Sequence, residues 1–255
     1  MSAPNKIAVA GATGRVGRHV VDILEADGHD VVAMSRSRGV DIITGDGLAE
    51  ALSGVQVIVD AATGPSPDEQ AATEFFTTAA RNLLDGGRRA GVEQIVVVSI
   101  IGADRFGGGY GAAKVAHEQA MLSGPIPARV LRASQFHEFV AQLMEWGARG
   151  DTIELPRMRT QLVAARAVAQ VLADLATSNG AQSTPAPILE IAGPREERLV
   201  EMAKLLAARR GDSTPIEEVS DPADPSQAVF ESGALLPGPD AILAGPTFAD
   251  WLDER

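Results

Sequence analysis

The sequence predicts an α/β fold built on a parallel, doubly wound β-sheet, and three observations lead to this prediction. Short apolar runs rich in β-branched residues alternate with longer segments of helical periodicity, which is the pattern of successive βαβ units. The apolar runs are nearly continuous, as expected for strands that are buried on both faces of a parallel sheet. The chain has 255 residues and is 45% hydrophobic, so it is long enough to bury a full core.

Strands and helices are expected to alternate regularly over the first half of the chain. The expected strands lie at 7–10, 30–34, 40–43, 55–61, 95–101 and 128–132. The expected helices lie at about 16–27, 48–52, 68–90 and 110–123. Gly28 and Gly91 follow the first and third of these helices, and glycine commonly ends a helix.

The pattern is looser after residue 135, and proline and glycine become frequent after Asp221. The expected helices lie at 137–148, 165–177 and 196–210, and the expected strands at 188–192 and 216–219. We therefore predict a main sheet domain over 1–135. A smaller, substrate-binding region over 136–255 is expected to be partly interleaved with it, because the strand at 188–192 can join the main sheet.

Composition excludes several classes of protein. With 22 Lys and Arg against 34 Asp and Glu, the formal net charge is −12, so nucleic acid is not an expected partner. The absence of cysteine rules out disulfides, a cysteine nucleophile and cysteine-ligated metals. The four histidines lack metal-ligand spacing, so no metal site is expected. There is no secretory signal pattern and no apolar run long enough to span a membrane. We expect a soluble, cytoplasmic protein with no membrane partner.

A glycine-rich loop directly follows the first expected strand. Residues 11–17 read GATGRVG and lead into a helix. The first glycine permits a tight turn, the second lets backbone amides approach a pyrophosphate, and the third lets the helix pack closely. The alternative is a plain turn. In this strand-loop-helix context we predict a nucleotide site. Its residues are Gly11, Thr13, Gly14, Arg15, Val16 and Gly17.

The residues that follow the second expected strand predict which dinucleotide binds. Residues 35–38 read SRSR and contain no acid, whereas an acid at this place would bind the free ribose hydroxyl of NAD(H). Arg36 and Arg38 can grip a 2′-phosphate, and Arg15 adds a third positive charge. We therefore predict NADP(H) in preference to NAD(H); a solvated basic loop is the alternative. Asp46 is placed either to reach the adenine or to serve as a turn aspartate.

A series of motifs follows this loop in a characteristic order. The motifs are GATGRVG, VIVDAATG, IVVVSIIG, YGAAK and LRASQFHEFV, within residues 6–140. Together they resemble the short-chain dehydrogenase/reductase superfamily, in particular its atypical NAD(P)H-binding, NmrA-like branch. The resemblance implies a Rossmann-type fold. It also implies cofactor contacts from the segment after the fourth expected strand, which contains Ala61, Ala62 and Thr63.

Tyr110 and Lys114 form a YxxxK motif whose side chains share one helix face. The lysine ammonium and the helix N-terminus are expected to lower the phenol pKa from its usual value of about 10, which would make Tyr110 a proton donor. The resemblance implies that Lys114 also holds the nicotinamide ribose. It further implies a carbonyl-polarising hydroxyl near the end of the fifth strand. Ser99 is the candidate, although in extended relatives this position falls one or two residues later, at Ile100 and Ile101.

Other residues are candidates for the substrate site. Gln135, Phe136 and His137 follow the sixth expected strand at its carboxyl end, where open α/β sheets bind ligands. A capping or structural role is the alternative for His137. Arg157 and Arg159 either meet an anionic substrate group or belong to an exposed basic loop.

Three further polar residues lie on expected helices. His117 and Glu118 follow Lys114 by three and four residues, and we expect them on a solvated helix surface. Asn82, on the long helix, resembles an asparagine that holds a water in some relatives; a solvent-facing residue is the alternative.

The main functional hypothesis is an NADPH-dependent oxidoreductase that acts on a small carbonyl, enone or quinone, with Tyr110 as proton donor. The alternative is a nonenzymatic NAD(P)H sensor, which the Tyr110/Lys114 pair disfavours and the apolar residues after Ser99 favour. A sugar-nucleotide epimerase or dehydratase is a weaker hypothesis, because that class usually has a longer C-terminal domain. The expected partner is a small-molecule substrate, and the chain is expected to be a monomer or homodimer. The neighbours Phe75 and Phe76 suggest that one of them faces outward.

Overall fold

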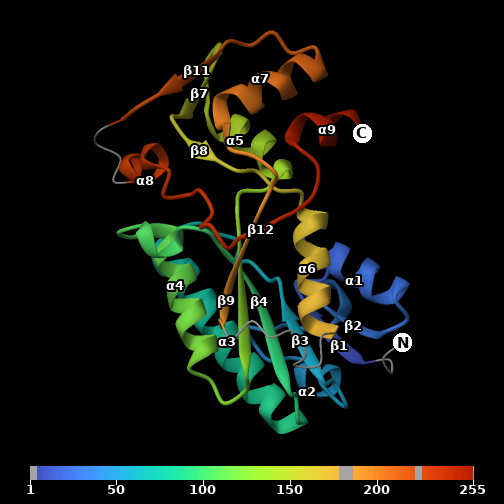
Figure 1. Cartoon of the computed structure of the whole chain (residues 1–255). Coiled ribbons are helices and arrows are strands. Elements are labelled where there is room, and N and C mark those ends of the chain that lie inside the picture. Colours follow the sequence, from blue (N-terminus) through green and yellow to red (C-terminus); the bar gives the residue numbers. More distant parts are fainter. Residues whose placement is uncertain (1–4, 178–185, 222–225, 255) are drawn as a thin grey trace. The chain divides into compact units, whose positions relative to one another are not determined.

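Figure 1 shows the chain as a computed structural model that describes residues 5–177, 186–221 and 226–254. The strands of the main sheet are β1 (Lys6–Ala10), β2 (Asp30–Met34), β3 (Val57–Asp60), β4 (Gln94–Ile100), β5 (Ala128–Ala133), β9 (Ile188–Ala192) and β12 (Ile242–Leu243). They lie in the order β12-β9-β5-β4-β3-β1-β2. The predicted fold class, a Rossmann-type parallel sheet flanked by helices, is confirmed.

The helices follow the predicted order. They are α1 (Gly17–Ala26), α2 (Leu48–Ala51), α3 (Glu69–Ala90), α4 (Gly109–Leu122), α5 (Val140–Trp146), α6 (Ala165–Thr177), α7 (Leu199–Arg210), α8 (Gln227–Ser232) and α9 (Phe248–Asp253). Local chemistry sets the ends of α3: Asp68 accepts a hydrogen bond from the backbone of Ala71, and Gly91 ends the helix with a φ of +80°. No helix within the described ranges is long and apolar enough to cross a membrane.

The order of strands in the sheet reverses at β1: β2 is added on one side of it, and β3 and the later strands are added on the other. This strand pairs in parallel with β2 on one side and with β3 on the other. The loops after β1 and β3 therefore leave the same edge of the sheet next to one another, and the backbone N–H of Ala61 donates to the carbonyl of Ala10 at 3.1 Å. In open α/β sheets, ligands bind at this kind of switch point.

The strand predicted at 40–43 does not form, and this prediction was wrong. The residues fold into a turn because Asp41 Oδ1 accepts hydrogen bonds from the backbone of Ile43 at 2.7 Å and of Thr44 at 3.3 Å. Gly45 and Gly47 follow with positive φ angles. The sheet therefore ends at β2 on this side.

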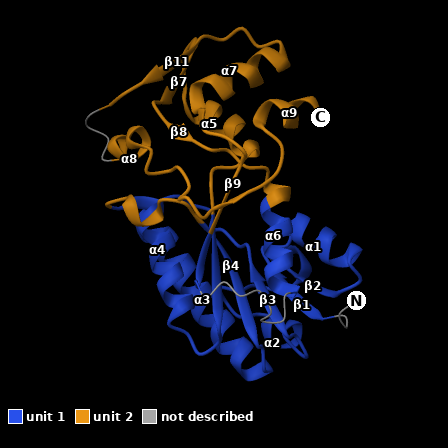
Figure 2. Ribbon diagram, viewed as in Figure 1, with its two compact units in different colours: residues 1–99, 108–132, 168–189 blue, residues 100–107, 133–167, 190–255 orange. Residues whose placement is uncertain are grey.

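The chain forms two compact units, each made of three segments (Figure 2). Unit 1 comprises 1–99, 108–132 and 168–189, and unit 2 comprises 100–107, 133–167 and 190–255. Consequently β4, β5, β9 and α6 each begin in one unit and end in the other. The assignment of substrate binding to 136–255 stays a prediction.

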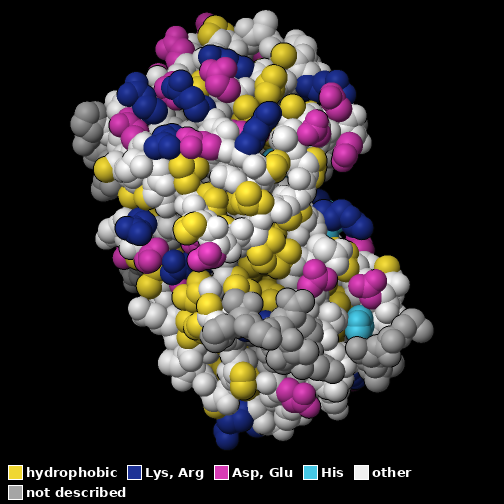
Figure 3. Space-filling view, viewed as in Figure 1, with side chains coloured by type: hydrophobic (Ala, Val, Ile, Leu, Met, Phe, Trp, Pro, Cys, Tyr) yellow, Lys and Arg dark blue, Asp and Glu magenta, His cyan; other side chains and the backbone are white. Residues whose placement is uncertain are grey.

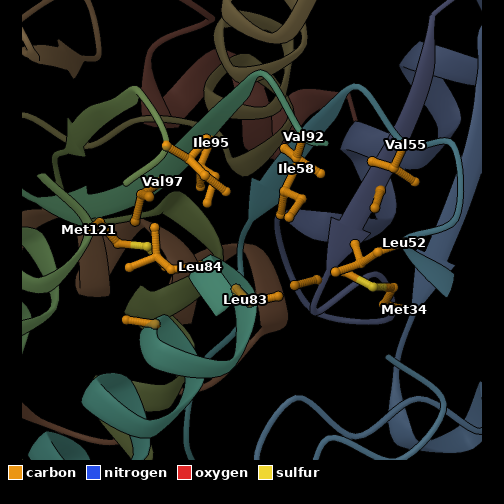
Figure 4. Close-up of a cluster of buried hydrophobic side chains, with 14 of the residues drawn as sticks. Met34, Leu52, Val55, Ile58, Leu83, Leu84, Val92, Ile95, Val97 and Met121 are labelled. Carbon is orange, nitrogen blue, oxygen red and sulfur yellow. The ribbon is translucent and has the colours of Figure 1, made fainter. Parts of the chain in front are cut away.

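Unit 1 has a core that joins the sheet to the helices on one of its faces. Ile58 and Ile95 come from β3 and β4, Leu83 and Leu84 from α3, and Met121 from α4; they form one cluster (Figure 4). Residues 7–10 and 57–60 are buried without interruption. These strands are therefore covered on both faces, as their apolar sequences predict.

Unit 2 contains two small sheets. One consists of β6 (Ala148–Arg149), β7 (Thr152–Pro156) and β11 (Ile216–Val219), and the other of β8 (Arg159–Thr160) and β10 (Glu197–Arg198). Because β10 pairs antiparallel with β8, α7 begins at Leu199 rather than at 196. The helix predicted at 137–148 is split into a 3-10 turn and α5.

Candidate functional site

The glycine loop connects β1 to α1 and lies against the segment that follows β3. Gly11 has a φ of +71°, and a Cβ on it would lie 2.7 Å from the carbonyl oxygen of Ala61. A Cβ on Gly17 would overlap the carbonyl oxygen of Gly11, so glycine is required where α1 packs on the loop. At Gly14 the one described atom within 4 Å of such a Cβ is the oxygen of Gly11, at 3.1 Å. The middle of the loop is therefore accessible to a ligand.

The N-terminus of α1 has the properties that a phosphate requires. No side chain caps it at Val16, and its first turn has no acidic residue. The backbone N–H groups of Arg18 and His19 donate to the carbonyls of Gly14 at 3.3 Å and Val16 at 3.0 Å, and the helix dipole favours a negative charge at this end of α1. Thr13 is exposed and Arg15 is partly buried in the same loop. The geometry fits a dinucleotide pyrophosphate held by the backbone of residues 11–17.

The basic segment forms a 3-10 turn (Arg36–Arg38) directly after β2. Both arginines are exposed, and no carboxylate in the described part of the chain forms an ion pair with either. Asp46 lies in an exposed turn, where its carbonyl accepts a hydrogen bond from the backbone of Asp41 at 2.9 Å. Its proposed contact with adenine stays a prediction.

Tyr110 occupies the first turn of α4. Glu69 on α3 accepts a hydrogen bond from the backbone N–H of Gly109 at 2.7 Å, so a neighbouring helix caps the start of α4. The Tyr110 hydroxyl lies 3.2 Å from Thr63 Oγ1. Thr63 is exposed in the segment after β3, so the structure brings together two residues that the sequence assigned to separate roles.

The predicted effect of Lys114 on Tyr110 is wrong. Burial raises the pKa of Tyr110 above its usual value, and the hydrogen bond from Thr63 only partly opposes this. Lys114 Nζ instead donates to the carbonyl of Val98 at 2.8 Å and lies 3.0 Å from His117 Nδ1. Burial lowers the pKa of Lys114 to about 8, against the opposing charges of Asp60 and Glu118. A ribose contact by Lys114 stays a prediction.

Ser99 is buried near the end of β4, and its exposed fraction is 2%. Its Oγ has no hydrogen-bond partner in the described part of the chain. A buried hydroxyl without a partner is uncommon in folded proteins, and this one lies in the strand that also supplies the Val98 carbonyl to Lys114. Its role in polarising a carbonyl stays a prediction.

The three candidate substrate residues lie in unit 2, and each has a structural contact there. Gln135 Oε1 accepts a hydrogen bond from Thr160 Oγ1 at 2.5 Å. Phe136 forms a parallel bridge with Val163. His137 is buried, and its Nε2 lies 3.1 Å from the carbonyl oxygen of Pro246. The rings of Phe248 and Trp251 pack against the imidazole, each at 5.3 Å between centroids.

The solvated surface expected for His117 and Glu118 is wrong. Their exposed fractions are 1% and 3%, because each has a buried partner on another element. His117 Nε2 lies 3.0 Å from Asp60 Oδ2, and Glu118 forms a two-bond pair with Arg132. Asn82 donates from Nδ2 to the carbonyls of residues 42 and 43, both at 2.9 Å. It therefore holds the turn that replaces the predicted strand.

The two adjacent phenylalanines in α3 differ in burial. Phe76 is buried, with an exposed fraction of 1%. Phe75 is partly buried and packs on Gly64, where a Cβ would lie 3.0 Å from its ring. The oligomeric state, monomer or homodimer, stays a prediction.

The two arginines proposed for an anionic substrate group each have an acidic partner. Arg157 Nε lies 3.3 Å from Glu218 Oε2, and Arg159 Nε lies 2.7 Å from Glu196 Oε1. Arg157 and Arg159, which the sequence analysis considered for an anionic substrate group, therefore form ion pairs within the protein.

The first half of the chain is similar to a known family. Residues 11–137 match a family model described as NAD(P)H-binding. The chain therefore contains an NAD(P)H-binding domain, and its fold is that of an atypical member of the short-chain dehydrogenase/reductase superfamily. The resemblance inferred from the sequence motifs is confirmed.

Solved structures with the same fold include several enzymes. UDP-N-acetylglucosamine 4-epimerase from Bacillus cereus has 18% identity and a TM-score of 0.69, over 98% of this chain and 94% of that one. An NADPH-dependent quinone oxidoreductase from Escherichia coli, complexed with NADPH, has 17% identity and a TM-score of 0.67, over 97% and 99%. A superfamily protein from Agrobacterium tumefaciens with bound NAD has 19% identity and a TM-score of 0.69, over 98% and 95%.

These comparisons also test one argument made from chain length. Because the match covers 94% of the epimerase chain, a short C-terminal region does not argue against the epimerase class. The neighbours include complexes with NAD and with NADPH, so similarity of fold supports NAD(P)H binding without a choice between the two.

Sequence reasoning missed Asp60. A signal was available, because an acid ends the otherwise apolar run VIVD, and a carboxylate inside a buried strand needs a partner. The position of His117, three residues after Lys114 on the same helix face, supplies that partner in the structure.

Proposed function

We propose that this protein is an NADP(H)-dependent oxidoreductase that reduces a small carbonyl, enone or quinone. The observation that carries the proposal is the Tyr110 hydroxyl, 3.2 Å from Thr63 Oγ1 in the unit that also holds the glycine loop. Burial keeps its pKa above the ordinary value, so the phenol is protonated at neutral pH. A protonated phenol is the state that a proton donor requires.

The proposed roles of the residues follow from their positions. NADPH, when bound, supplies the hydride. The backbone of 11–17 binds the pyrophosphate, and the segment that contains Ala61, Ala62 and Thr63 lies against that loop. Tyr110 donates the proton of its hydroxyl to the substrate oxygen and regains a proton from solvent, while Thr63 orients the hydroxyl.

The preference for NADP(H) is proposed from Arg36 and Arg38. Both are exposed after β2, and a doubly charged phosphate would provide the acidic partner that the described residues do not provide. For comparison, Arg159 in unit 2 already has a carboxylate at 2.7 Å.

Arg36→Asp tests this preference. We expect it to raise the Kd for NADPH by about tenfold or more, because a charge-assisted hydrogen bond contributes about 1.5–3 kcal/mol, and to leave the Kd for NADH within about twofold. Cofactor fluorescence measures both constants. Arg88→Asp, an exposed residue at the end of α3, is the matched control for charge. Equal weakening of NADPH and NADH by Arg36→Asp would contradict the phosphate assignment.

A nonenzymatic NAD(P)H sensor is the second candidate, and one observation favours it. The Lys114 ammonium is bonded to Val98 and His117 rather than to Tyr110, which is unlike the arrangement implied by the YxxxK motif. Oxidation of NADPH in the presence of quinones, aldehydes and enones separates the two candidates. We expect oxidation with at least one acceptor; tight binding with no oxidation by any of them would favour the sensor. UDP-sugars in the same panel test the epimerase alternative.

A further inference from the structure

Two hydroxyl groups lie next to each other in unit 1, one after β3 and the other at the start of α4. The Tyr110 hydroxyl lies 3.2 Å from Thr63 Oγ1. Thr63 is exposed and Tyr110 is partly buried. Within the described part of the chain, neither hydroxyl has a second hydrogen-bond partner. We call these two residues the Thr63–Tyr110 pair.

The number of protons in this pair leaves one of them for a ligand. Each hydroxyl carries a single proton, and the contact between the two oxygens uses one of the two. The second proton points away from the contact. A carbonyl oxygen has two lone pairs, so one such oxygen can accept from both hydroxyls when it takes the place of their mutual hydrogen bond.

Buried contacts fix the backbone on the Thr63 side of the pair. The N–H of Ala62 donates to Asp60 Oδ1 at 3.0 Å, and Asp60 Oδ2 lies 3.0 Å from His117 Nε2 on α4. The exposed fractions of Asp60 and His117 are both 1%. The segment that carries Thr63 is therefore anchored to the helix that carries Tyr110, at a point separate from the pair itself.

Contacts with α3 fix the Tyr110 side of the pair. Glu69 Oε2 accepts a hydrogen bond from the N–H of Gly109 at 2.7 Å, immediately before Tyr110. The ring of Phe76 meets the Tyr110 ring edge-on, with 5.7 Å between centroids. The two hydroxyls are thus held in place before any substrate binds. Donors that are fixed in advance stabilise a developing charge without a cost of reorganisation.

Ser99 and Thr63 differ in their access to a ligand. The exposed fraction of Ser99 is 2%, and its Oγ is buried. A substrate oxygen can reach a buried atom only if neighbouring groups move. Thr63 is exposed and contacts Tyr110 directly. Its hydroxyl therefore already has the position that a second donor to the substrate of Tyr110 requires.

Building on the proposed function, we propose that Thr63 is a second catalytic residue, whose hydroxyl donates a hydrogen bond to the substrate oxygen that Tyr110 protonates. As hydride arrives at the carbonyl carbon, the π electron pair of the C=O bond moves onto the oxygen, which takes the proton of Tyr110. Thr63 keeps its own proton and stabilises the negative charge that develops on this oxygen. This is the role that the sequence analysis assigned to Ser99.

Variants of Thr63 test the need for its hydroxyl. Valine has nearly the shape of threonine and no hydroxyl, whereas serine keeps the donor. The assay is NADPH oxidation at saturating NADPH, with the quinone, aldehyde or enone that wild type reduces fastest. We expect Thr63→Val to lower kcat by about tenfold or more and Thr63→Ser to stay within about threefold. Thr77→Val removes a hydroxyl that bonds to its own helix α3 at 2.7 Å, and it should keep the wild-type kcat.

The Tyr110→Phe background separates a direct contact with substrate from an effect through Tyr110. Adding Thr63→Val to Tyr110→Phe should lower the remaining rate by about tenfold. It should also raise the Kd of the acceptor for the NADPH complex by about threefold or more. Quenching of NADPH fluorescence measures this Kd, which decides alone where the rate is below detection. If Thr63 only orients Tyr110, neither quantity changes in this background, and that result would overturn the inference.

The outcomes also separate this inference from the proposed function. If wild type reduces an acceptor and folded Thr63→Val reduces it at the same rate, the inference is overturned and the proposed function stands. If wild type reduces none of the acceptors, the proposed function is contradicted and the inference is overturned with it. If circular dichroism finds Thr63→Val unfolded, Thr63→Ala takes its place with the same expected losses.

Discussion

The two units handle their charged side chains in different ways. Unit 1 buries Asp60, His117 and Lys114 together, and it also buries Glu118 against the partly buried Arg132, whose side chain is 13% exposed. In the ion pairs described within unit 2, by contrast, the basic partner is always at least 45% exposed. On the face of unit 2 seen in Figure 3, Lys and Arg side chains lie beside Asp and Glu side chains.

This difference indicates which of the two units is expected to hold the catalytic groups. Exposed ion pairs contribute little to stability and tolerate change, whereas buried charges are costly and are kept only where each has a partner. The buried histidine of unit 2, His137, bonds to a backbone carbonyl and packs between aromatic rings. We therefore expect the proton donor in unit 1, although unit 2 also buries one carboxylate, that of Glu197, whose pKa is raised by burial.

The largest effect is expected from the glycine loop of unit 1. Gly11→Ala places a Cβ 2.7 Å from the Ala61 carbonyl oxygen at a φ of +71°, and strain plus overpacking should lower the free energy of unfolding by about 3 kcal/mol. The displaced loop should also weaken NADPH binding by about tenfold or more. Gly211→Ala in unit 2 has a similar φ of +68° and no atom within 4 Å, so it should cost about 1 kcal/mol. Chemical denaturation and cofactor fluorescence measure both, and equal costs would refute the close approach at Gly11.

The next effect concerns the pH dependence of stability. Burial lowers the pKa of Lys114 from 10.5 to about 8, so between these values the unfolded chain binds a proton that the folded chain has lost. The contribution of Lys114 to the free energy of unfolding should therefore increase as the pH rises from 8 to 10.5, by on the order of 3 kcal/mol.

Lys114→Met should remove this gain, and chemical denaturation across the pH range measures the difference from wild type. Lys204→Met replaces an exposed lysine of unit 2 that is paired with Glu201, and it should keep the wild-type slope. A Lys114→Met slope identical to that of the wild type would mean that Lys114 is not held in a desolvated site.

A smaller effect is expected at His137 in unit 2. His137→Leu removes the hydrogen bond to the Pro246 carbonyl, which should lower the free energy of unfolding by about 1–2 kcal/mol. NADPH affinity and turnover should change by less than about twofold, and His137→Gln should recover part of the stability. A loss of turnover without a loss of stability would instead restore His137 as a substrate residue.

Features set by neighbouring residues could be predicted from the sequence. The glycine loop, the continuously apolar strands β1 and β3, and the ends of α3 at Asp68 and Gly91 all follow from local chemistry. The strand predicted at 40–43 was wrong because the apolar residues of this segment have the composition that is typical of a strand. The Asp41 side chain, together with Asn82 from forty residues away, stabilises a turn there instead.

The arrangement around Tyr110 could not be predicted for a related reason. The partner of His117 is Asp60, which lies 57 residues away in the chain, and Thr63 is 47 residues from Tyr110. Helical spacing placed Lys114 and Tyr110 on one face. It could not reveal that a third residue on that face, His117, engages the lysine.

The central claim is that Tyr110, in unit 1, is the proton donor of an NADPH-dependent reduction. The most direct test compares NADPH oxidation by wild type and Tyr110→Phe with the quinone, aldehyde or enone that wild type reduces fastest. We expect Tyr110→Phe to lower kcat by about 10²–10⁴-fold, with the NADPH Kd within about twofold of wild type. A Tyr110→Phe variant that oxidises NADPH at the wild-type rate would contradict the claim.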